Sequence, residues 1–442
     1  MSNVPDIKVT PPGPSAREII AKDEHYVATT TKSLPVVARS AKGLVVEDVD
    51  GNLLLDFSSG ISVLNTGHCH PRVVEAVRKQ SGELMHFAGT DFYYDLQASL
   101  AQRLSEITPG PPEKKVFFGN SGAESIEAAI KIAKWSTQRM RVIAFIGAFH
   151  GRTTGALSLT ASKNVQKQRF FPTMDGVTHI PFANCYRCPY HLEYPSCDLW
   201  CAKTLDETYL STFVPPDEVA ALFGEPVQGE GGYIVPPKEF YPTIRKTLDK
   251  YGILLVDDEV QAGLGRTGRM WGIEHWGIYP DILTISKSLG SGIPISATVF
   301  RKELDFGVQG AHSNTFGGNL VGCAASLATL DVLSEEKLVE RSEKMGAYFR
   351  KRLEELQEKH ELIGDVRGLG LMLAIELVRD RRTKDFATAE RDRVIAEAFR
   401  RGLILLGCGR SGIRLIPSLT VTEEQIDTAL AILDESLSTV AK

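Results

Sequence analysis

The stretch KKVFFGNSGAESIEAAIKIAKWSTQRMRVIAFIGAFHG, residues 114–151, contains a complete strand–helix–strand unit. Val116–Phe118 is a short apolar run, a turn of small residues follows it, and a helix is predicted from about Ala123 to Trp135. Arg141–Phe145 is a second apolar run, which ends in glycine and polar residues. Strands that alternate with helices predict an α/β fold with a mostly parallel central sheet. The pattern recurs at residues 220–223, 253–256 and 282–285.

The C-terminal quarter of the chain has a different pattern. Residues 327–360 are helix-periodic with a break near Ser334, and they are followed by an apolar strand at 371–375. A further helix ends at Gly402, a strand follows at 403–406, and Thr422–Gln425 is a capping box that opens the last helix. We therefore expect a smaller α+β domain, to which the N-terminus also contributes. The predicted divisions are an N-terminal arm and part of the small domain at 1–65, a large domain at 66–325 and the C-terminal small domain at 326–442.

Composition excludes several classes of function. The 442 residues include 50 Lys and Arg against 55 Asp and Glu, a net charge of −5, which is not the footprint of a protein that binds nucleic acid or anionic lipid. No apolar run approaches the roughly 18 residues that a membrane span requires. The first 20 residues lack the pattern of an export signal. We expect a cytoplasmic protein that contacts neither nucleic acid nor membrane.

The residues at the predicted strand ends have a chemistry in common. The turn at 119–124, GNSGAE, opens a helix, and the backbone N–H groups of such a turn suit a phosphate. Phe149 and His150 follow the next strand, Asp258 follows the strand at 253–256, and Lys287 follows the strand at 282–285. Taken singly, these residues have ordinary interpretations as helix caps, core residues or solvated side chains. Together they are the parts that pyridoxal phosphate needs.

Eight motifs follow one another along the chain. They are GISVLNTGHCHP (60–71), GNSGAESIEAAIKIA (119–133), FHGRT (149–153), EPVQGEGG (225–232), DDEVQAGLGRTG (257–268), SKSLGSGIP (286–294), SNTFGGN (313–319) and VRGLGLMLAIE (366–376). In these motifs and their order the chain resembles the class III, fold-type I pyridoxal-phosphate aminotransferases, and among them most the 4-aminobutyrate (ω-amino acid) aminotransferases. The resemblance covers the chain from about Lys32 to its C-terminus.

The resemblance implies how the cofactor is held. Lys287 would bind pyridoxal phosphate covalently and then transfer the substrate proton, and Asp258 would keep the pyridine nitrogen protonated. The other implied cofactor contacts are Ser121, Gly122, Ala123, Phe149, His150, Gln261 and Thr315. Thr315 would reach the phosphate of the neighbouring subunit, so the resemblance implies a homodimer with shared active sites, and a tetramer is left open.

The resemblance also implies four substrate contacts. Arg152 would bind the distal carboxylate of an ω-amino acid, and Arg414 would bind the α-carboxylate of 2-oxoglutarate or glutamate through two parallel hydrogen bonds. Glu230 would act as a gate that pairs with Arg414 when the substrate has no α-carboxylate. Ile61 would lie over the cofactor ring and shape the pocket, and Glu225 would support the site from behind. The expected partners are an amino acid donor and a 2-oxo acid acceptor.

A cluster of cysteines departs from the common pattern. Cys185, Cys188, Cys197 and Cys201 lie within CYRCPYHLEYPSCDLWC, residues 185–201. Their spacing leaves a zinc site, disulfides and reduced thiols open, and none of these would take part in catalysis. Cys69, Cys323 and Cys408 are interpreted as small core residues.

Several alternative functions remain open at this stage. A racemase or epimerase of the same fold uses the same cofactor, and dialkylglycine decarboxylases are also similar, although less so at EPVQGEGG. The motif GLGRTG (263–268) is consistent with a dinucleotide-dependent oxidoreductase, although the residues that follow it, RMWG (269–272), do not have the pattern of a helix start. A binding module that uses the cysteine cluster is a further alternative. The donor itself is open among 4-aminobutyrate, ornithine, lysine and β-alanine.

Overall fold

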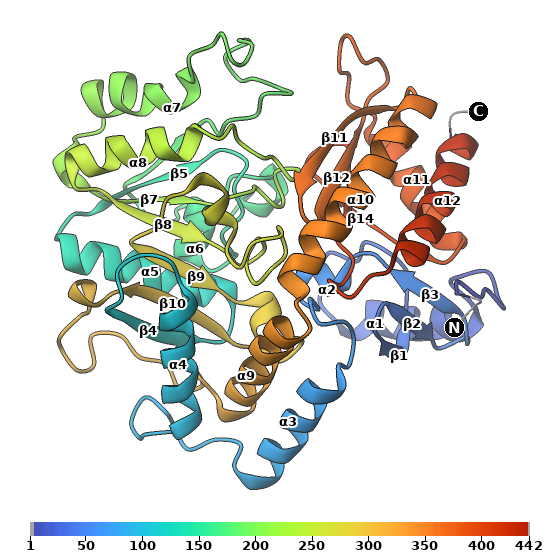
Figure 1. The fold of residues 1–442 in the computed structure, drawn as a ribbon, viewed down its shortest axis with the longest axis horizontal. Coiled ribbons are helices and arrows are strands. Elements are labelled where there is room, and N and C mark those ends of the chain that lie inside the picture. Colours follow the sequence, from blue (N-terminus) through green and yellow to red (C-terminus); the bar gives the residue numbers. More distant parts are fainter. Residues whose placement is uncertain (1–3, 441–442) are drawn as a thin grey trace.

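A computed structural model describes residues 4–440 of the chain, and a seven-stranded sheet lies at the centre of the larger domain (Figure 1). Only β10 runs antiparallel to its neighbours β4 and β9, so the mostly parallel sheet expected from the sequence is confirmed. In spatial order the strands are β4 (Lys114–Gly119), β10 (Ser296–Arg301), β9 (Ile282–Ile285), β8 (Leu254–Asp258), β7 (Val219–Gly224), β5 (Arg141–Phe145) and β6 (Val177–Ile180).

Helices cover both faces of this sheet, because side chains alternate between two apolar cores. Val142 and Ala144 of β5 lie in the core beneath α5, whereas Ile143 and Phe145 lie in the core that includes α8. The large-domain helices are α3 (Pro71–Glu83), α4 (Asp95–Ile107), α5 (Gly122–Thr137), α6 (Thr154–Leu159), α7 (Trp200–Thr204), α8 (Phe240–Tyr251) and α9 (Leu320–Glu335).

The small domain consists of two four-stranded sheets with helices against them (Figure 1). One sheet has the order β11 (Ile363–Leu369), β12 (Met372–Leu377), β15 (Gly412–Leu415) and β14 (Leu406–Cys408). The other has the order β1 (Ala38–Lys42), β2 (Val45–Asp48), β3 (Leu53–Asp56) and β13 (Leu403–Ile404), which joins N-terminal to C-terminal residues. The helices of these parts are α1 (Pro14–Tyr26), α2 (Ser59–Ser62), α10 (Leu338–Lys359), α11 (Thr388–Arg400) and α12 (Glu423–Val440).

Two expectations from the sequence are wrong in detail. The strand predicted at 403–406 is two strands in different sheets. β13 pairs with β3, β14 pairs with β15, and the buried residue Leu405 lies between them. Cys69 is exposed, since it lies in the turn before α3 with a φ of 49°. The capping box is confirmed, because the Gln425 backbone N–H donates to Thr422 Oγ1 and the Thr422 N–H donates to the Gln425 side chain.

The predicted boundary between residues 325 and 326 falls inside α9 (Leu320–Glu335), which packs against α3 and α4 of the large domain. The helix break expected near Ser334 lies between Glu335 and Leu338, where Lys337 adopts a left-handed conformation. Within residues 4–440, we find no helix with the length and apolar character needed to cross a membrane.

Two buried carboxyl groups in β8 and the residue after it make stability depend on pH. Burial and the neighbouring Glu259 raise the pKa of Asp257 well above its usual value, and burial raises the pKa of Glu259 to about 7. Both carboxyl oxygens of Asp257 lack a hydrogen-bond partner among the described residues. Because the folded pKa values are raised, the folded state binds protons more tightly than the unfolded chain, and stability falls as pH rises from about 4.5 through 7.

Asp257→Asn is expected to flatten this pH dependence, since an amide cannot ionise. The variant should exceed the wild type in free energy of unfolding by about 1–3 kcal/mol at pH 8, and the difference should shrink towards pH 5. Urea unfolding of both proteins between pH 5 and pH 8 measures the effect. An unchanged slope in the variant would show that Asp257 does not cause the pH dependence.

Candidate active site

Two neighbouring strands end at the acid and the lysine that the sequence singles out. β8 ends at Asp258, and Lys287 follows the last residue of β9 after a single serine. The strands run parallel, with Asp258 paired to Thr284. Because the carboxyl ends of parallel strands meet at one edge of the sheet, both residues border the same site.

The environment of Lys287 suits a nucleophilic amine. Burial lowers its pKa, although the nearby acids Asp258 and Glu225 act in the opposite direction. The amine is therefore closer to its neutral form at pH 7 than the amine of an exposed lysine. Its backbone φ of 26° lies in a region that residues with a side chain rarely adopt, which is a kind of strain that occurs at functional sites.

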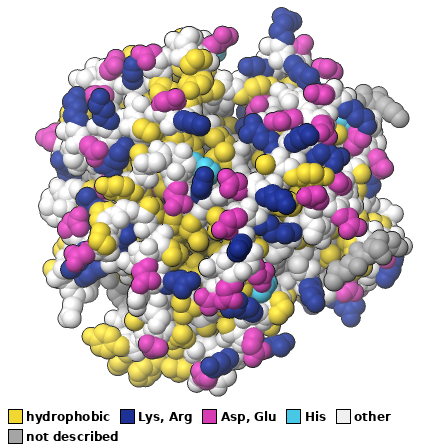
Figure 2. All heavy atoms as spheres, viewed as in Figure 1, with side chains coloured by type: hydrophobic (Ala, Val, Ile, Leu, Met, Phe, Trp, Pro, Cys, Tyr) yellow, Lys and Arg dark blue, Asp and Glu magenta, His cyan; other side chains and the backbone are white. Residues whose placement is uncertain are grey.

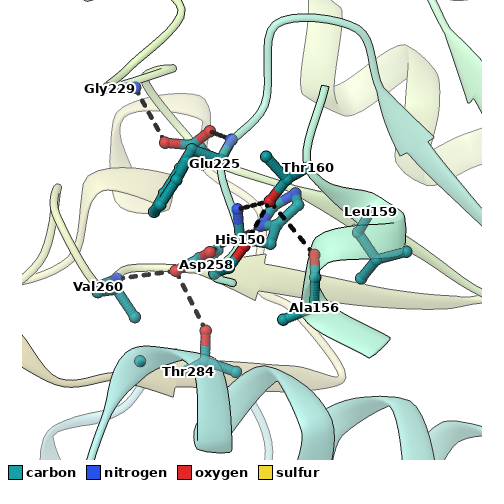
Figure 3. A network of polar contacts seen from close by, with 12 residues as sticks. His150, Ala156, Leu159, Thr160, Glu225, Gly229, Asp258, Val260 and Thr284 are labelled. Carbon is teal, nitrogen blue, oxygen red and sulfur yellow. Dashed lines mark hydrogen bonds and ion pairs between the residues drawn. The ribbon is translucent and has the colours of Figure 1, made fainter. Parts of the chain in front are cut away.

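A hydrogen-bond network fixes the carboxylate of Asp258 (Figure 3). Its Oδ2 lies 2.7 Å from Nδ1 of His150, and its Oδ1 accepts from the Val260 backbone N–H at 3.1 Å and from Thr284 Oγ1 at 3.3 Å. Burial by itself would lower the pKa of His150, but the hydrogen bond with Asp258 raises it above its usual value. The network therefore fixes the orientation of the Asp258 carboxyl group beside a buried histidine whose pKa is raised.

The turn before α5 forms a cradle of backbone donors. Ser121 is the N-cap of this helix, and its side chain accepts from the backbone N–H of Glu124. The N–H groups of Gly122 and Ala123 precede the first hydrogen bond within the helix, so the helix itself does not use them. A Cβ at Gly122 would lie 2.9 Å from Val260, and one at Gly151 would lie 2.8 Å from the Cβ of Ala123. The cradle therefore requires glycine at both positions.

Glu225, at the end of β7, ties two segments of the site together (Figure 3). Its Oε1 accepts from the backbone N–H of Phe149 at 3.0 Å, and its Oε2 accepts from that of Gly229 at 2.9 Å. Burial raises the pKa of Glu225 to about 7. Gln261, three residues after Asp258, accepts a hydrogen bond from the hydroxyl of Tyr233 at 2.8 Å. These contacts hold the backbone of Phe149 and the side chain of Gln261 in place.

Glu230 and Arg414 form an ion pair between the two domains. Oε1 of Glu230 lies 2.8 Å from Nη2 of Arg414 on β15, and the arginine side chain is 7% exposed. Nε and Nη1 of Arg414 have no hydrogen-bond partner among the described residues. Although burial raises the pKa of Glu230, Arg414 and Lys163 outweigh it and lower that pKa below its usual value. Lys163, 3.1 Å from the other oxygen of Glu230, was not predicted from the sequence.

Three predicted residues lie apart from these contacts. Arg152, Thr315 and Ile61 are exposed, and none makes a side-chain hydrogen bond to the site groups within the described part of the chain. The guanidinium of Arg152 lies 5.7 Å from the centre of the Phe149 ring, which places it beside the site. Ile61 has a φ of 67° within a left-handed turn, an outlier for a β-branched residue.

The loop GLGRTG (263–268) has a structural role. No α-helix opens after it, since a 3₁₀ segment at Gly272–Trp276 comes next. Arg266 is fully buried, and its guanidinium donates to the carbonyl oxygens of Leu371 and Pro417 and to Oδ1 of Asn65. This arginine joins the large domain to the small one. The interpretation as a dinucleotide-binding turn is therefore wrong.

The four clustered cysteines line one cavity of about 20 Å³ and are all free thiols. Burial and the neighbouring thiols raise the pKa of Cys201 to about 11. Among residues 4–440, no group of three or more His, Cys, Asp or Glu side chains is placed to hold a metal ion. The candidate metal ligands Cys185, Cys188, Cys197 and Cys201 are therefore not brought together as a metal site in this structure.

The residues of the site fit pyridoxal phosphate. Asp258 offers a charged acceptor for the pyridine nitrogen, Lys287 an amine of lowered pKa, and the start of α5 unused N–H groups for the phosphate. The buried Nε2 of His150 has no hydrogen-bond partner among the described residues. These donors and acceptors correspond to the polar groups of the cofactor.

Comparisons with known proteins agree with this chemistry. The family model described as "Aminotransferase class-III" matches residues 26–437. The chain is 39% identical to an alanine/serine racemase of Pyrococcus horikoshii, over 98% of this chain and 92% of that protein. It is 38% identical to a probable 4-aminobutyrate aminotransferase of Bacillus subtilis, over 93% and 94% of the two chains.

A solved structure extends the similarity to the fold. The (S)-enantioselective ω-transaminase of Thermomicrobium roseum superimposes with a TM-score of 0.89 at 33% identity, over 97% of this chain and 99% of that one. The cofactor expected at the site is pyridoxal phosphate, as in this family. The chain therefore belongs to the class III aminotransferases, enzymes of fold type I that move an amino group between a donor and a 2-oxo acid.

Proposed function

We propose that the protein transfers the amino group of an ω-amino acid of the 4-aminobutyrate type to 2-oxoglutarate. The observation that supports this best is the ion pair between Glu230 and Arg414. Nε and Nη1 of Arg414 have no hydrogen-bond partner among residues 4–440, so the guanidinium can bind a carboxylate, and Glu230 neutralises it when no such carboxylate is present. An enzyme that alternates between donors without an α-carboxylate and acceptors with one needs this arrangement.

Each residue has a separate task in this reaction. Pyridoxal phosphate, when bound, supplies the electron sink for the breaking C–H bond. Asp258 would hold the pyridine nitrogen in its protonated form, and the amine of Lys287 would accept the proton from the substrate carbon and return it. Phe149 would stack on the ring, and Arg152, beside Phe149, would bind the distal carboxylate of the donor.

A ping-pong reaction gives a direct test of this proposal. 4-Aminobutyrate alone should change the visible absorbance of the holoenzyme, and 2-oxoglutarate added afterwards should reverse that change and appear as glutamate. The proposal fails if 4-aminobutyrate leaves the spectrum unchanged at concentrations where an α-amino acid changes it.

Racemisation of an α-amino acid is the second candidate function. The 39% identity to an alanine/serine racemase over 98% of the chain favours it. A racemase keeps the α-carboxylate on Arg414 throughout and has no need for Glu230 to replace it. Incubation of L-alanine with the enzyme in D₂O separates the two functions, because a racemase inverts the carbon without forming a 2-oxo acid.

We propose a homodimer with shared active sites as the working form. Large apolar side chains are exposed on the connection between α3 and α4, which lies at the lower edge of Figure 2: Leu84, Met85, Phe87, Phe92 and Tyr93. Phe316, next to Thr315, is also exposed and lies against His86. A second copy of the chain would cover this surface and bring Thr315 to the phosphate of the neighbouring site.

Mixed dimers test whether Thr315 acts across the subunits. Lys287→Ala and Thr315→Ala subunits should combine into heterodimers with one doubly altered site and one intact site. The heterodimers should then show about half the activity of the wild-type dimer, far above either altered homodimer. If their activity stays at the level expected for one Thr315→Ala site, Thr315 serves its own subunit.

A further inference from the structure

A third charged side chain contacts the pair formed by Glu230 and Arg414. Nζ of Lys163 lies 3.1 Å from Oε2 of Glu230, while Oε1 of the same carboxylate lies 2.8 Å from Nη2 of Arg414. Lys163 follows α6 in the large domain, and Arg414 lies on β15 of the small domain. The carboxylate therefore joins two cations, one from each domain.

The backbone on both sides of Glu230 is held in place. The N–H of Gly229 donates to Glu225 at 2.9 Å, and the carbonyl of Glu230 accepts from the N–H of Gly409 at 2.9 Å. Gly232 donates back to the carbonyl of Gly229 at 3.1 Å. Glu230 can therefore release Arg414 by rotating its side chain, without a movement of the loop.

Rotation away from Arg414 would otherwise leave a charge without a partner. The side chain of Glu230 is 16% exposed, and an ionised carboxylate at such a position is unfavourable without a counter-charge. Lys163 already contacts the second oxygen, and its side chain is 38% exposed on a flexible stem that can follow the carboxylate. The geometry thus offers Glu230 a cation after it has left Arg414.

We propose that Lys163 is a positioning residue that stabilises Glu230 in its open position and so lets one pocket accept both kinds of substrate. This inference rests on the proposed function. In the closed state Glu230 contacts both Arg414 and Lys163, whereas in the open state only Lys163 remains. Loss of Lys163 therefore disfavours the open state more than the closed one. It should weaken the binding of ligands that need Arg414 to be free.

Two unreactive acids test this in the holoenzyme by titration calorimetry. Glutarate has two carboxylates and needs Arg414, whereas valerate has one and does not. In Lys163→Met the dissociation constant of glutarate should rise about three- to tenfold, as expected for a partly exposed ion pair, while that of valerate should stay within about twofold. Lys163→Arg should restore glutarate binding. Lys167→Met, which removes the same charge from a nearby residue, should leave the dissociation constant of glutarate unchanged.

The outcomes separate the inference from the function on which it rests. The inference is wrong if Lys163→Met and a second variant, Lys163→Gln, bind glutarate as tightly as the wild type. It is also wrong if both variants lose affinity for glutarate and valerate to the same extent. Arg414→Ala tests the proposed function, which fails if this variant binds glutarate normally. Weakened binding in Arg414→Ala together with normal binding in the Lys163 variants would overturn only the inference. In steady-state kinetics, Lys163→Met should raise the KM for 2-oxoglutarate and leave the rate of the donor half-reaction unchanged.

Discussion

Replacing Lys287 with alanine is expected to lower turnover by about 10⁴-fold or more, because in the proposed function this one side chain both binds the cofactor and moves the substrate proton. Burial lowers the pKa of this lysine. Because β8 and β9 pair in parallel, Lys287 and Asp258 lie at the same edge of the sheet. Alanine has no amine that could attach covalently to the cofactor, so borohydride would have no such linkage to reduce. The variant should therefore release its cofactor on denaturation after borohydride treatment, whereas the wild type should retain it.

Lys287→Arg is the matched control for charge and size. Arginine keeps a cation at this position, but its guanidinium is a poor nucleophile, so the variant should lose the same covalent attachment. Both variants should keep the fold, as judged by far-UV circular dichroism. A Lys287→Ala protein that still fixes the cofactor under borohydride at the wild-type level would remove Lys287 from this role.

Substitutions at Arg414 and Glu230 are expected to have opposite effects on the two half-reactions. Arg414→Ala removes the proposed partner of the α-carboxylate, so the half-reaction with 2-oxoglutarate should slow by about 10²–10⁴-fold, since breaking such a buried pair costs about 3–5 kcal/mol. Glu230→Ala leaves Arg414 without its neutralising partner and should slow the half-reaction with the ω-amine while sparing that with glutamate. Single-turnover kinetics of each half-reaction measure both effects.

Glu230→Gln is a useful companion, because it keeps the size of the side chain and removes only its charge. It should slow the ω-amine half-reaction in the same direction as Glu230→Ala, although by less. If Glu230→Ala slows both half-reactions to the same extent, Glu230 is not a gate, and the racemase alternative gains support.

The fold was predictable where local pattern and burial agree. The buried strands β5, β7 and β9 and the helix α5 lie where apolar runs and small-residue turns place them, since a strand covered on both faces reads as a continuous apolar run. The division of residues 403–408 between two sheets was not predictable. Leu403 and Leu406 look alike in the sequence, and only the pairing with β3 or β15 distinguishes them.

The site was predictable where residues follow strand ends. Asp258 and His150 are 108 positions apart, and the parallel sheet brings their side chains within 2.7 Å, as their positions at the end of β8 and after β5 suggest. Lys163 has no such signal, because it follows a short helix in an irregular loop and resembles a solvated lysine. Its contact with Glu230 depends on the course of that loop, which neither apolar periodicity nor a turn motif specifies.

The donor specificity of the wild-type holoenzyme tests the central proposal most directly. 4-Aminobutyrate, β-alanine, ornithine and lysine, beside alanine and leucine, would each be incubated with 2-oxoglutarate in D₂O, with glutamate and α-deuterium incorporation measured together. We expect glutamate to form in amounts equal to the ω-amino donor consumed. Inversion and α-deuteration of alanine or leucine, with no glutamate from any ω-amino donor, would contradict it.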